Sequence, residues 1–134
     1  MAIALGLSYE LHTSINTRAA MLAQATKEIS LIVEALGGKV QTINNFCGIG
    51  DIYLTCTDSK SRNFSFGKSI AEIGLENSLK NNKKTIEGIF ATKIGYKIVV
   101  KHKIDAPVLK EIYNVLYKKA NPKTFVEKIT KKII

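Results

Sequence analysis

The residues best suited to chemistry lie between Gly48 and Gly67. This stretch concentrates a carboxylate, an arginine, an amide and several hydroxyl groups. The residues are Asp51, Thr55, Thr57, Ser59, Ser61, Arg62 and Asn63. Carboxylates, amides and hydroxyls can orient a polar substrate, and an arginine can bind the oxygens of a phosphate or carboxylate with two parallel donors. The stretch therefore predicts a site for a small, polar, anionic ligand.

Arginine is rare in this chain, which makes its presence at position 62 informative. Of the 20 basic residues, only Arg18 and Arg62 are arginine. A lysine ammonium is a point charge and lacks the bidentate geometry of a guanidinium. Ser61 and Asn63 flank Arg62 and can add donors to the same oxygens. The alternative is a polar surface turn in which Arg62 pairs with a nearby carboxylate, and the residues alone leave both interpretations open.

Two further patterns in this stretch have ordinary explanations. Gly48-Ile-Gly50 is not a dinucleotide-binding fingerprint, because the third glycine of that pattern would fall at Tyr53. Asp51 follows a glycine, where an aspartate often caps a helix. Capping therefore stands beside a catalytic role as an interpretation of Asp51.

A longer pattern resembles a known enzyme family. Asp51-Ile-Tyr-Leu-Thr-Cys-Thr is followed, ten residues after the aspartate, by Ser61-Arg62-Asn63 and then Phe66-Gly67. This closely resembles the bacterial type of NAD(P)-dependent glycerol-3-phosphate dehydrogenase, within its C-terminal, substrate-binding domain. Ala2-Ile-Ala-Leu-Gly-Leu resembles the opening of that domain. The resemblance implies an all-α, multi-helix bundle like the C-terminal domains of glycerol-3-phosphate and 6-phosphogluconate dehydrogenases.

The resemblance also implies roles for the residues of the motif. Ser61, Arg62 and Asn63 would hold the phosphate of glycerol 3-phosphate or dihydroxyacetone phosphate. Asp51 would lie beside the reacting carbon and orient the substrate and a catalytic lysine. Thr55, one helical turn after Asp51, would share its face. We therefore expect these five residues to bind substrate, with Asp51 also serving catalysis.

The expected cofactor is NAD or NADP, bound mainly by a Rossmann domain that the sequence does not contain. The resemblance implies that Arg62 also reaches this cofactor and that Glu87 is the second contact. Thr85 stands at the adjacent contact position, where bacterial relatives usually carry an apolar residue. Without the resemblance, Glu87 would be interpreted as a solvated acid in the first turn of a helix, where the helix dipole favours a negative charge.

The catalytic lysine of the family and its Rossmann domain have no match in this sequence. The general acid/base of the family is a lysine a few residues before the segment that starts here at Ala2, and no later lysine matches it. We therefore expect residues 1–134 to form one helical substrate-binding and dimerisation domain, inactive as a dehydrogenase alone.

The resemblance also implies a reaction for the intact enzyme. It would interconvert dihydroxyacetone phosphate and sn-glycerol 3-phosphate by hydride transfer, for phospholipid synthesis. The alternative is a split-gene or remnant module that only binds a phosphate ligand or dimerises. A homodimer and a separate Rossmann domain are the expected protein partners.

Helical periodicity of the apolar residues runs through most of the chain and predicts an all-α fold. One helix is expected from about 16 to 36, with Ser14 or Asn16 as its cap and Gly37 at its end. A second is expected from about 85 to 101, with an apolar stripe through Phe90 and Ile94. A third would start at Pro107, capped by Asp105. Asn121-Pro122 gives the same start signal for a last helix.

Composition excludes several other kinds of protein. The net charge is +9, but the lysines are spread along the chain without interleaved aromatic residues, so we expect no specific nucleic-acid partner. No apolar run reaches the roughly 18 residues that span a bilayer, so we expect no membrane insertion. Cys47, Cys56, His12 and His102 match no metal-binding spacing. Two reduced cysteines fit a cytoplasmic protein.

Overall fold

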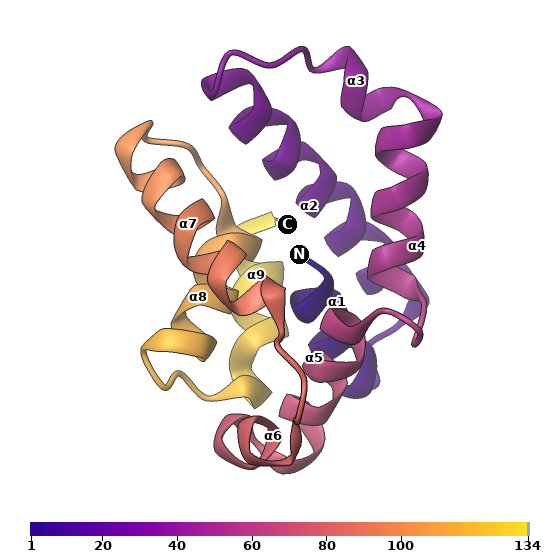
Figure 1. The fold of residues 1–134 in the computed structure, drawn as a ribbon, viewed down its shortest axis with the longest axis vertical. Helices are drawn as coiled ribbons and strands as arrows, with labels where there is room; N and C mark the ends of the chain where they lie inside the picture. Colours follow the sequence, from indigo (N-terminus) through magenta and orange to yellow (C-terminus); the bar gives the residue numbers. More distant parts are fainter. Residues whose placement is uncertain (134) are drawn as a thin grey trace.

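The computed structural model describes the backbone of residues 1–133 and the side chains of residues 1–132, and it is helical with no strand in this part of the chain (Figure 1). The prediction of an all-α fold is confirmed. The elements in chain order are α1 Ala2–Glu10, α2 Ile15–Ala35, α3 Gln41–Asn44, the π-helix η1 Phe46–Gly50, α4 Asp51–Thr57, α5 Arg62–Ile73, α6 Leu75–Asn81, α7 Glu87–Lys101, α8 Pro107–Tyr117, the 3₁₀-helix η2 Pro122–Thr124 and α9 Phe125–Ile133.

Helix α1 lies at the centre of the bundle, and residues 2–8 are all buried. Its closest neighbour is α5, and glycines on both helices allow this approach. A Cβ atom on Gly6 would collide with the backbone of Phe64, and one on Gly67 would collide with the backbone of Ile3. This close packing fixes the start of α5, where Ser61-Arg62-Asn63 lies, relative to α1.

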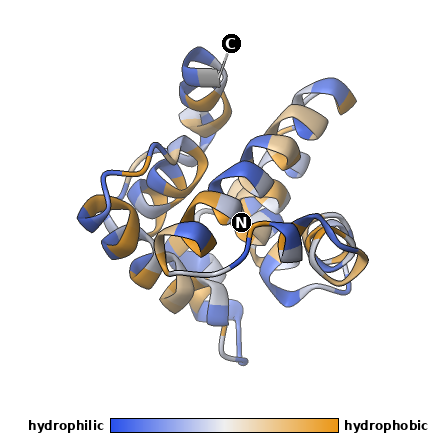
Figure 2. Cartoon of the chain, turned by 90° about the horizontal axis from the view of Figure 1, so that it is seen from above, coloured by the Kyte–Doolittle hydropathy of each residue, from blue (hydrophilic) through white to orange (hydrophobic). Residues whose placement is uncertain are grey.

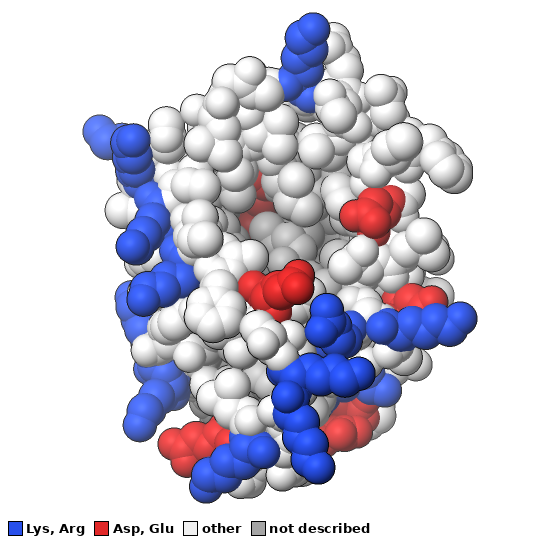
Figure 3. Space-filling model, viewed as in Figure 1, with Lys and Arg blue, Asp and Glu red and all other residues white. Residues whose placement is uncertain are grey.

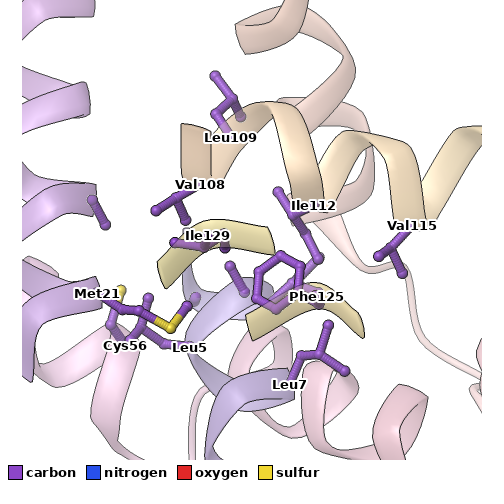
Figure 4. Close-up of a cluster of buried hydrophobic side chains, with 14 of the residues drawn as sticks. Leu5, Leu7, Met21, Cys56, Val108, Leu109, Ile112, Val115, Phe125 and Ile129 are labelled. Atoms are coloured by element: carbon purple, nitrogen blue, oxygen red, sulfur yellow. The ribbon is translucent and has the colours of Figure 1, made fainter. Parts of the chain in front are cut away.

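The C-terminal helices close the core on the other side of α1. Phe125 and Ile129 of α9 are buried; Phe125 lies between Ile112 of α8 and Leu7 of α1, and Ile129 lies beside Val108 of α8 (Figure 4). Burial of such side chains contributes about 1.5–3 kcal/mol each. Coloured by hydropathy, the helices show apolar and polar residues on different sides (Figure 2), as expected for amphipathic helices around one core.

The cap of α8 comes from another helix. Asp105 was expected to cap it, but the N-cap residue is Ala106 and no side chain at that position accepts a bond. Instead, the backbone N–H groups of Val108 and Leu109 donate to the two carboxylate oxygens of Glu28 on α2, each at 2.9 Å. Glu28 is completely buried. The prediction of Asp105 as the cap is therefore wrong, because an acid 80 residues away in the sequence supplies it.

Other local predictions have mixed outcomes. Ser14 caps α2 by accepting the N–H of Thr17, and Gly37 follows that helix with a φ of +82°. Asn121 caps η2. The prediction that the apolar stripe of α7 packs inward is wrong in part. Phe90 and Ile94 are each 61% exposed, whereas Val99 and Thr92 are buried. The helix was predicted correctly, but the face that packs inward differs.

Candidate functional site

Four of the residues expected to bind substrate or cofactor line one cavity. It has a volume of about 370 Å³ and lies where the starts of α1, α4 and α7 meet α2 and the start of α5. Asp51 and Thr55 come from α4, Asn63 from α5 and Glu87 from α7. The rest of the wall is Met1, Ala2, Ile3, Ile29, Ile52, Cys56, Gly88 and Ala91. We refer to this space as the Asp51 cavity.

The start of α5 is joined to the start of α7 by a side chain. The side-chain oxygen of Asn63 accepts the backbone N–H of Gly88 at 2.9 Å. The NH₂ group of Asn63 then remains as a donor. A Cβ on Gly88 would lie 2.6 Å from that same oxygen, so any side chain at position 88 would push the Asn63 amide out of its present position. The amide thus holds together two segments 25 residues apart.

The neighbours of this pair form an ion pair at the rim of the cavity. Arg62 Nη2 lies 3.7 Å from Glu87 Oε1, and the two side chains are 56% and 78% exposed. An exposed pair of this kind is worth about 0–1 kcal/mol. Arg62 can therefore exchange Glu87 for a stronger anionic partner at little cost. Figure 3 shows acidic side chains beside the central hollow of this face and basic side chains along its left edge and lower part.

Ser61, Arg62 and Asn63 form the N-terminal turn of the 12-residue helix α5. Ser61 is its N-cap, and its hydroxyl oxygen accepts the N–H of Phe64 at 3.3 Å. The hydroxyl hydrogen remains free to donate to a ligand. Helix N-termini favour anions because their backbone N–H groups point outward and the helix dipole is positive there. Arg62 adds a full positive charge at the same end.

Asp51 is the first residue of α4, and its side chain is not used as a cap. No ion pair within the described part of the chain involves it. Thr55 lies one turn later and lines the same cavity. The carboxylate and hydroxyl are therefore presented together on one face of α4, as the spacing predicts. Capping is not the role of Asp51 in this structure.

Arg62 lines a second hollow, to which Asp51 does not contribute. This space has a volume of about 270 Å³ and is mainly lined by hydroxyl, amide and basic side chains: Ser65, Ser69, Ser78, Asn81, Asn82 and Lys84, with Phe66 and Ile86. Lys84 was not among the residues expected from the sequence. Arg62 thus lines this hollow, and it is connected to the Asp51 cavity through its ion-pair partner Glu87.

Comparison with known proteins shows the family of this chain. The sequence model of a family described as NAD-dependent glycerol-3-phosphate dehydrogenase C-terminus matches residues 1–127. The chain belongs to this family. A glycerol-3-phosphate dehydrogenase [NAD(P)+] of Malacoplasma penetrans is 44% identical over 128 residues, which are 96% of this chain and 38% of that protein. One of Clostridium botulinum is 35% identical over 96% of this chain and 39% of its own length.

A solved structure shows the same fold. The crystal structure of glycerol-3-phosphate dehydrogenase from Coxiella burnetii superposes on this chain with a TM-score of 0.89 at 32% sequence identity. The superposed part is 97% of this chain and 40% of the Coxiella chain. The chain therefore spans about two-fifths of the length of these glycerol-3-phosphate dehydrogenases and matches their C-terminal domain.

Three residues expected from the glycerol-3-phosphate dehydrogenase resemblance do not line the Asp51 cavity, namely Ser61, Arg62 and Thr85. Thr85 is exposed and lines neither of the two hollows. Cys56 is buried in the cavity wall, where burial raises the pKa of its thiol, so it is a packing residue. Lys84 and the hydrogen bond between Gly88 and Asn63 are missed by sequence reasoning. The available signals were the glycine directly after Glu87 and the lysine three residues before it.

Two other features of the described residues bear on the class of protein. No helix within residues 1–133 is long and apolar enough to cross a lipid bilayer. No group of three or more His, Cys, Asp or Glu side chains in this part of the chain is placed to hold a metal ion.

Proposed function

We propose that this chain is the substrate-binding domain of a glycerol-3-phosphate dehydrogenase, and that the Asp51 cavity and its Arg62 rim hold glycerol 3-phosphate or dihydroxyacetone phosphate. The observation that carries this proposal is the bond between Asn63 and Gly88. It brings the Ser61-Arg62-Asn63 turn to Glu87, and it places Asn63 in the same cavity as Asp51 and Thr55. A phosphate site and a carboxylate for the reacting end thus lie side by side.

The phosphate of the substrate is held at the start of α5. Arg62 leaves Glu87 and takes two phosphate oxygens in bidentate geometry. The Ser61 hydroxyl and the Asn63 NH₂ donate to the remaining oxygens, since the acceptor of each is already used within the protein. Binding energy from this remote group positions the reacting carbon.

At the other end of the substrate, Asp51 accepts hydrogen bonds from hydroxyl groups and Thr55 supports it from the next turn. When bound, NAD(P)H supplies the hydride for the carbonyl carbon. Arg62 and Glu87 are more than half exposed at the rim, so they are accessible to a nucleotide held mainly by another domain. The role of Thr85 as a third cofactor contact has less support, because its side chain lies outside both hollows.

The rest of the reaction requires groups beyond the 134 residues. The resemblance expects the acid–base lysine shortly before Ala2, and Met1, Ala2 and Ile3 line the Asp51 cavity. We propose that the proton donor enters the cavity at this end of α1, next to a Rossmann domain. The 134-residue chain alone then oxidises no NADH. We also propose that the chain forms a homodimer and works in the cytoplasm.

Calorimetric titration with glycerol 3-phosphate tests the proposed site without turnover. Arg62→Lys keeps the charge but loses the bidentate geometry, so we expect binding to weaken roughly tenfold, equivalent to about 1.4 kcal/mol. Lys60→Met is the matched control, because it removes an exposed positive charge two residues away and leaves affinity within about twofold. Equal affinity for the parent and Arg62→Lys would overturn the proposed phosphate site.

A further inference from the structure

A third cavity lies behind α4, on the side of the helix away from the proposed substrate. It has a volume of about 360 Å³, is bordered by α1, α2, α4 and α5, and opens to solvent beside Ile15 and Tyr53. Its lining is Leu5, Tyr9, Ile15, Arg18, Ala19, Leu22, Tyr53, Cys56, Thr57 and Phe64. We call it the Arg18 cavity. Its volume falls in the range of small-molecule sites, which are mostly apolar with a few placed polar groups.

One charged side chain stands in this apolar lining. Arg18 lies over the ring of Tyr9, with its Cζ atom 4.9 Å from the ring centroid. None of the ion pairs in the described part of the chain includes Arg18. Tyr9 also contacts Phe64 edge to face, at 5.7 Å between ring centres. The aromatic pair thus supports one side of the guanidinium while no carboxylate neutralises it.

The charge and the lining together define the chemistry of a ligand. A cation without an acidic partner, next to an apolar cavity, suits a molecule with one anionic group and an apolar body. A doubly charged, hydroxylated compound such as glycerol 3-phosphate would leave its hydroxyl groups against Leu5, Leu22 and Phe64. Polar groups buried without partners cost about 1–3 kcal/mol each. The Arg18 cavity therefore differs in chemistry from the Asp51 cavity.

Helix α4 is the wall between the two cavities. Tyr53 and Thr57 face the Arg18 cavity, Asp51 and Thr55 face the other, and the buried side chain of Cys56 lines both. The Arg18 cavity also contacts Phe64, the residue next to Asn63. A molecule in the Arg18 cavity would therefore touch the two elements that present Asp51 and Asn63.

We propose that the Arg18 cavity binds an amphiphilic carboxylate, with its apolar chain among Leu5, Leu22 and Phe64 and its carboxylate on Arg18. Occupancy sets the position of α4 and so of Asp51 and Thr55. Binding itself does not depend on the proposed dehydrogenase function, because it uses no residue assigned to glycerol 3-phosphate.

The test is a titration of the isotope-labelled 134-residue chain with octanoate, followed by backbone amide NMR. We expect saturable shifts at Tyr53–Thr57 and at Phe64. Arg18→Met should weaken binding at least tenfold, and Ala19→Leu should block it by filling the cavity while keeping the charge. Lys27→Met removes an exposed charge from the same helix and should bind octanoate like the parent. Octanol, which lacks the charge, should bind the parent at least tenfold more weakly.

Several results would overturn the proposal. One is the absence of saturable shifts in the parent chain. Another is equal affinity of the folded parent and Arg18→Met, with folding checked by circular dichroism. A third is a dimer that covers the cavity, since Ile15 and Tyr53 in its lining are 73% and 59% exposed. If sedimentation shows a dimer that octanoate does not dissociate and Ala19→Leu disrupts, a second copy covers the cavity instead of a small ligand.

Discussion

The side-chain oxygen of Asn63 accepts the backbone N–H of Gly88 at 2.9 Å, and this bond ties the start of α5 to the start of α7. Asn63 and Gly88 are the neighbours of Arg62 and Glu87, which form an ion pair across the same junction. The junction forms one side of the Asp51 cavity. Four residues from two distant motifs thus depend on one hydrogen bond for their arrangement.

Gly88→Ala should break this junction. Because the added Cβ would lie 2.6 Å from the Asn63 oxygen, Asn63 or α7 must move. We expect a loss of about 1–3 kcal/mol in the free energy of unfolding, and weaker binding of glycerol 3-phosphate. Urea denaturation and calorimetry measure the two effects. Gly50→Ala is the matched control, since a Cβ there meets nothing within 4 Å and should leave both quantities nearly unchanged. Equal behaviour of the two variants would contradict the account.

Substitutions of Asn63 separate its structural role from its role in binding. Asn63→Asp keeps an oxygen for the Gly88 N–H but loses the NH₂ donor and adds a negative charge beside the expected phosphate. Stability should therefore stay within about 0.5 kcal/mol of the parent, while affinity for glycerol 3-phosphate falls at least tenfold. Asn63→Ala should lower both, because the partly buried N–H of Gly88 loses its acceptor. If Asn63→Asp binds as tightly as the parent, the NH₂ group does not contact the phosphate.

Glu87→Gln probes the ion pair at the rim. The pair is exposed, so its loss should change the free energy of unfolding by less than about 0.5 kcal/mol. Removing the carboxylate also removes the competitor for Arg62, so inorganic phosphate should bind about two- to threefold more tightly. Calorimetry with phosphate at low and high salt measures this gain, which should shrink as salt rises. Weaker phosphate binding in this variant would show that Glu87 does not compete for Arg62.

Glu28 gives the stability a defined dependence on pH. Burial raises the pKa of its carboxyl, although the N–H groups of Val108 and Leu109 and the amide of Gln24 partly counter this. A raised pKa means that the folded state binds the proton more tightly than the unfolded state. This contribution to stability is therefore full below the unfolded pKa of about 4.3 and is lost as pH rises through the folded pKa.

The measurement is urea denaturation across this pH range for the parent and Glu28→Gln. The free energy of unfolding of the parent, minus that of Glu28→Gln, should fall as pH rises above about 4 and then level off. Glu28→Ala should cost about 2–4 kcal/mol near pH 4, because two buried N–H groups lose their acceptor, and this cost should also fall as pH rises. A difference that rises with pH would mean that the pKa of Glu28 is lowered in the folded state.

The sequence predicted what local spacing encodes. The period of the apolar residues predicted the helices, Ser14 and Gly37 marked the ends of α2, and a compact motif placed Asp51, Thr55 and Asn63 near one another. Contacts between distant segments were not predicted. Glu28 caps a helix 80 residues away, and Asn63 binds a backbone group 25 residues away. Neither bond leaves a signal in the spacing of nearby residues.

The inward face of α7 was mispredicted for a related reason. Phe90 and Ile94 are apolar at helical spacing, yet they are exposed, while Val99 is completely buried. Periodicity identifies a helix and its apolar positions, but neighbouring elements decide which positions pack inward. Here Leu109 of α8 lies against Gly95, so the helix presents this side to the bundle.

The central claim is that this domain supplies the substrate half of a dehydrogenase site, and a chimera tests it most directly. The chain would replace the matching C-terminal part of the Malacoplasma penetrans enzyme, with which it shares 44% identity. We predict that the chimera oxidises NADH in the presence of dihydroxyacetone phosphate. We also predict that Arg62→Met in the chimera lowers kcat/KM at least a hundredfold, whereas Lys60→Met does not. A folded chimera that is inactive, or one that Arg62→Met leaves fully active, would contradict the account.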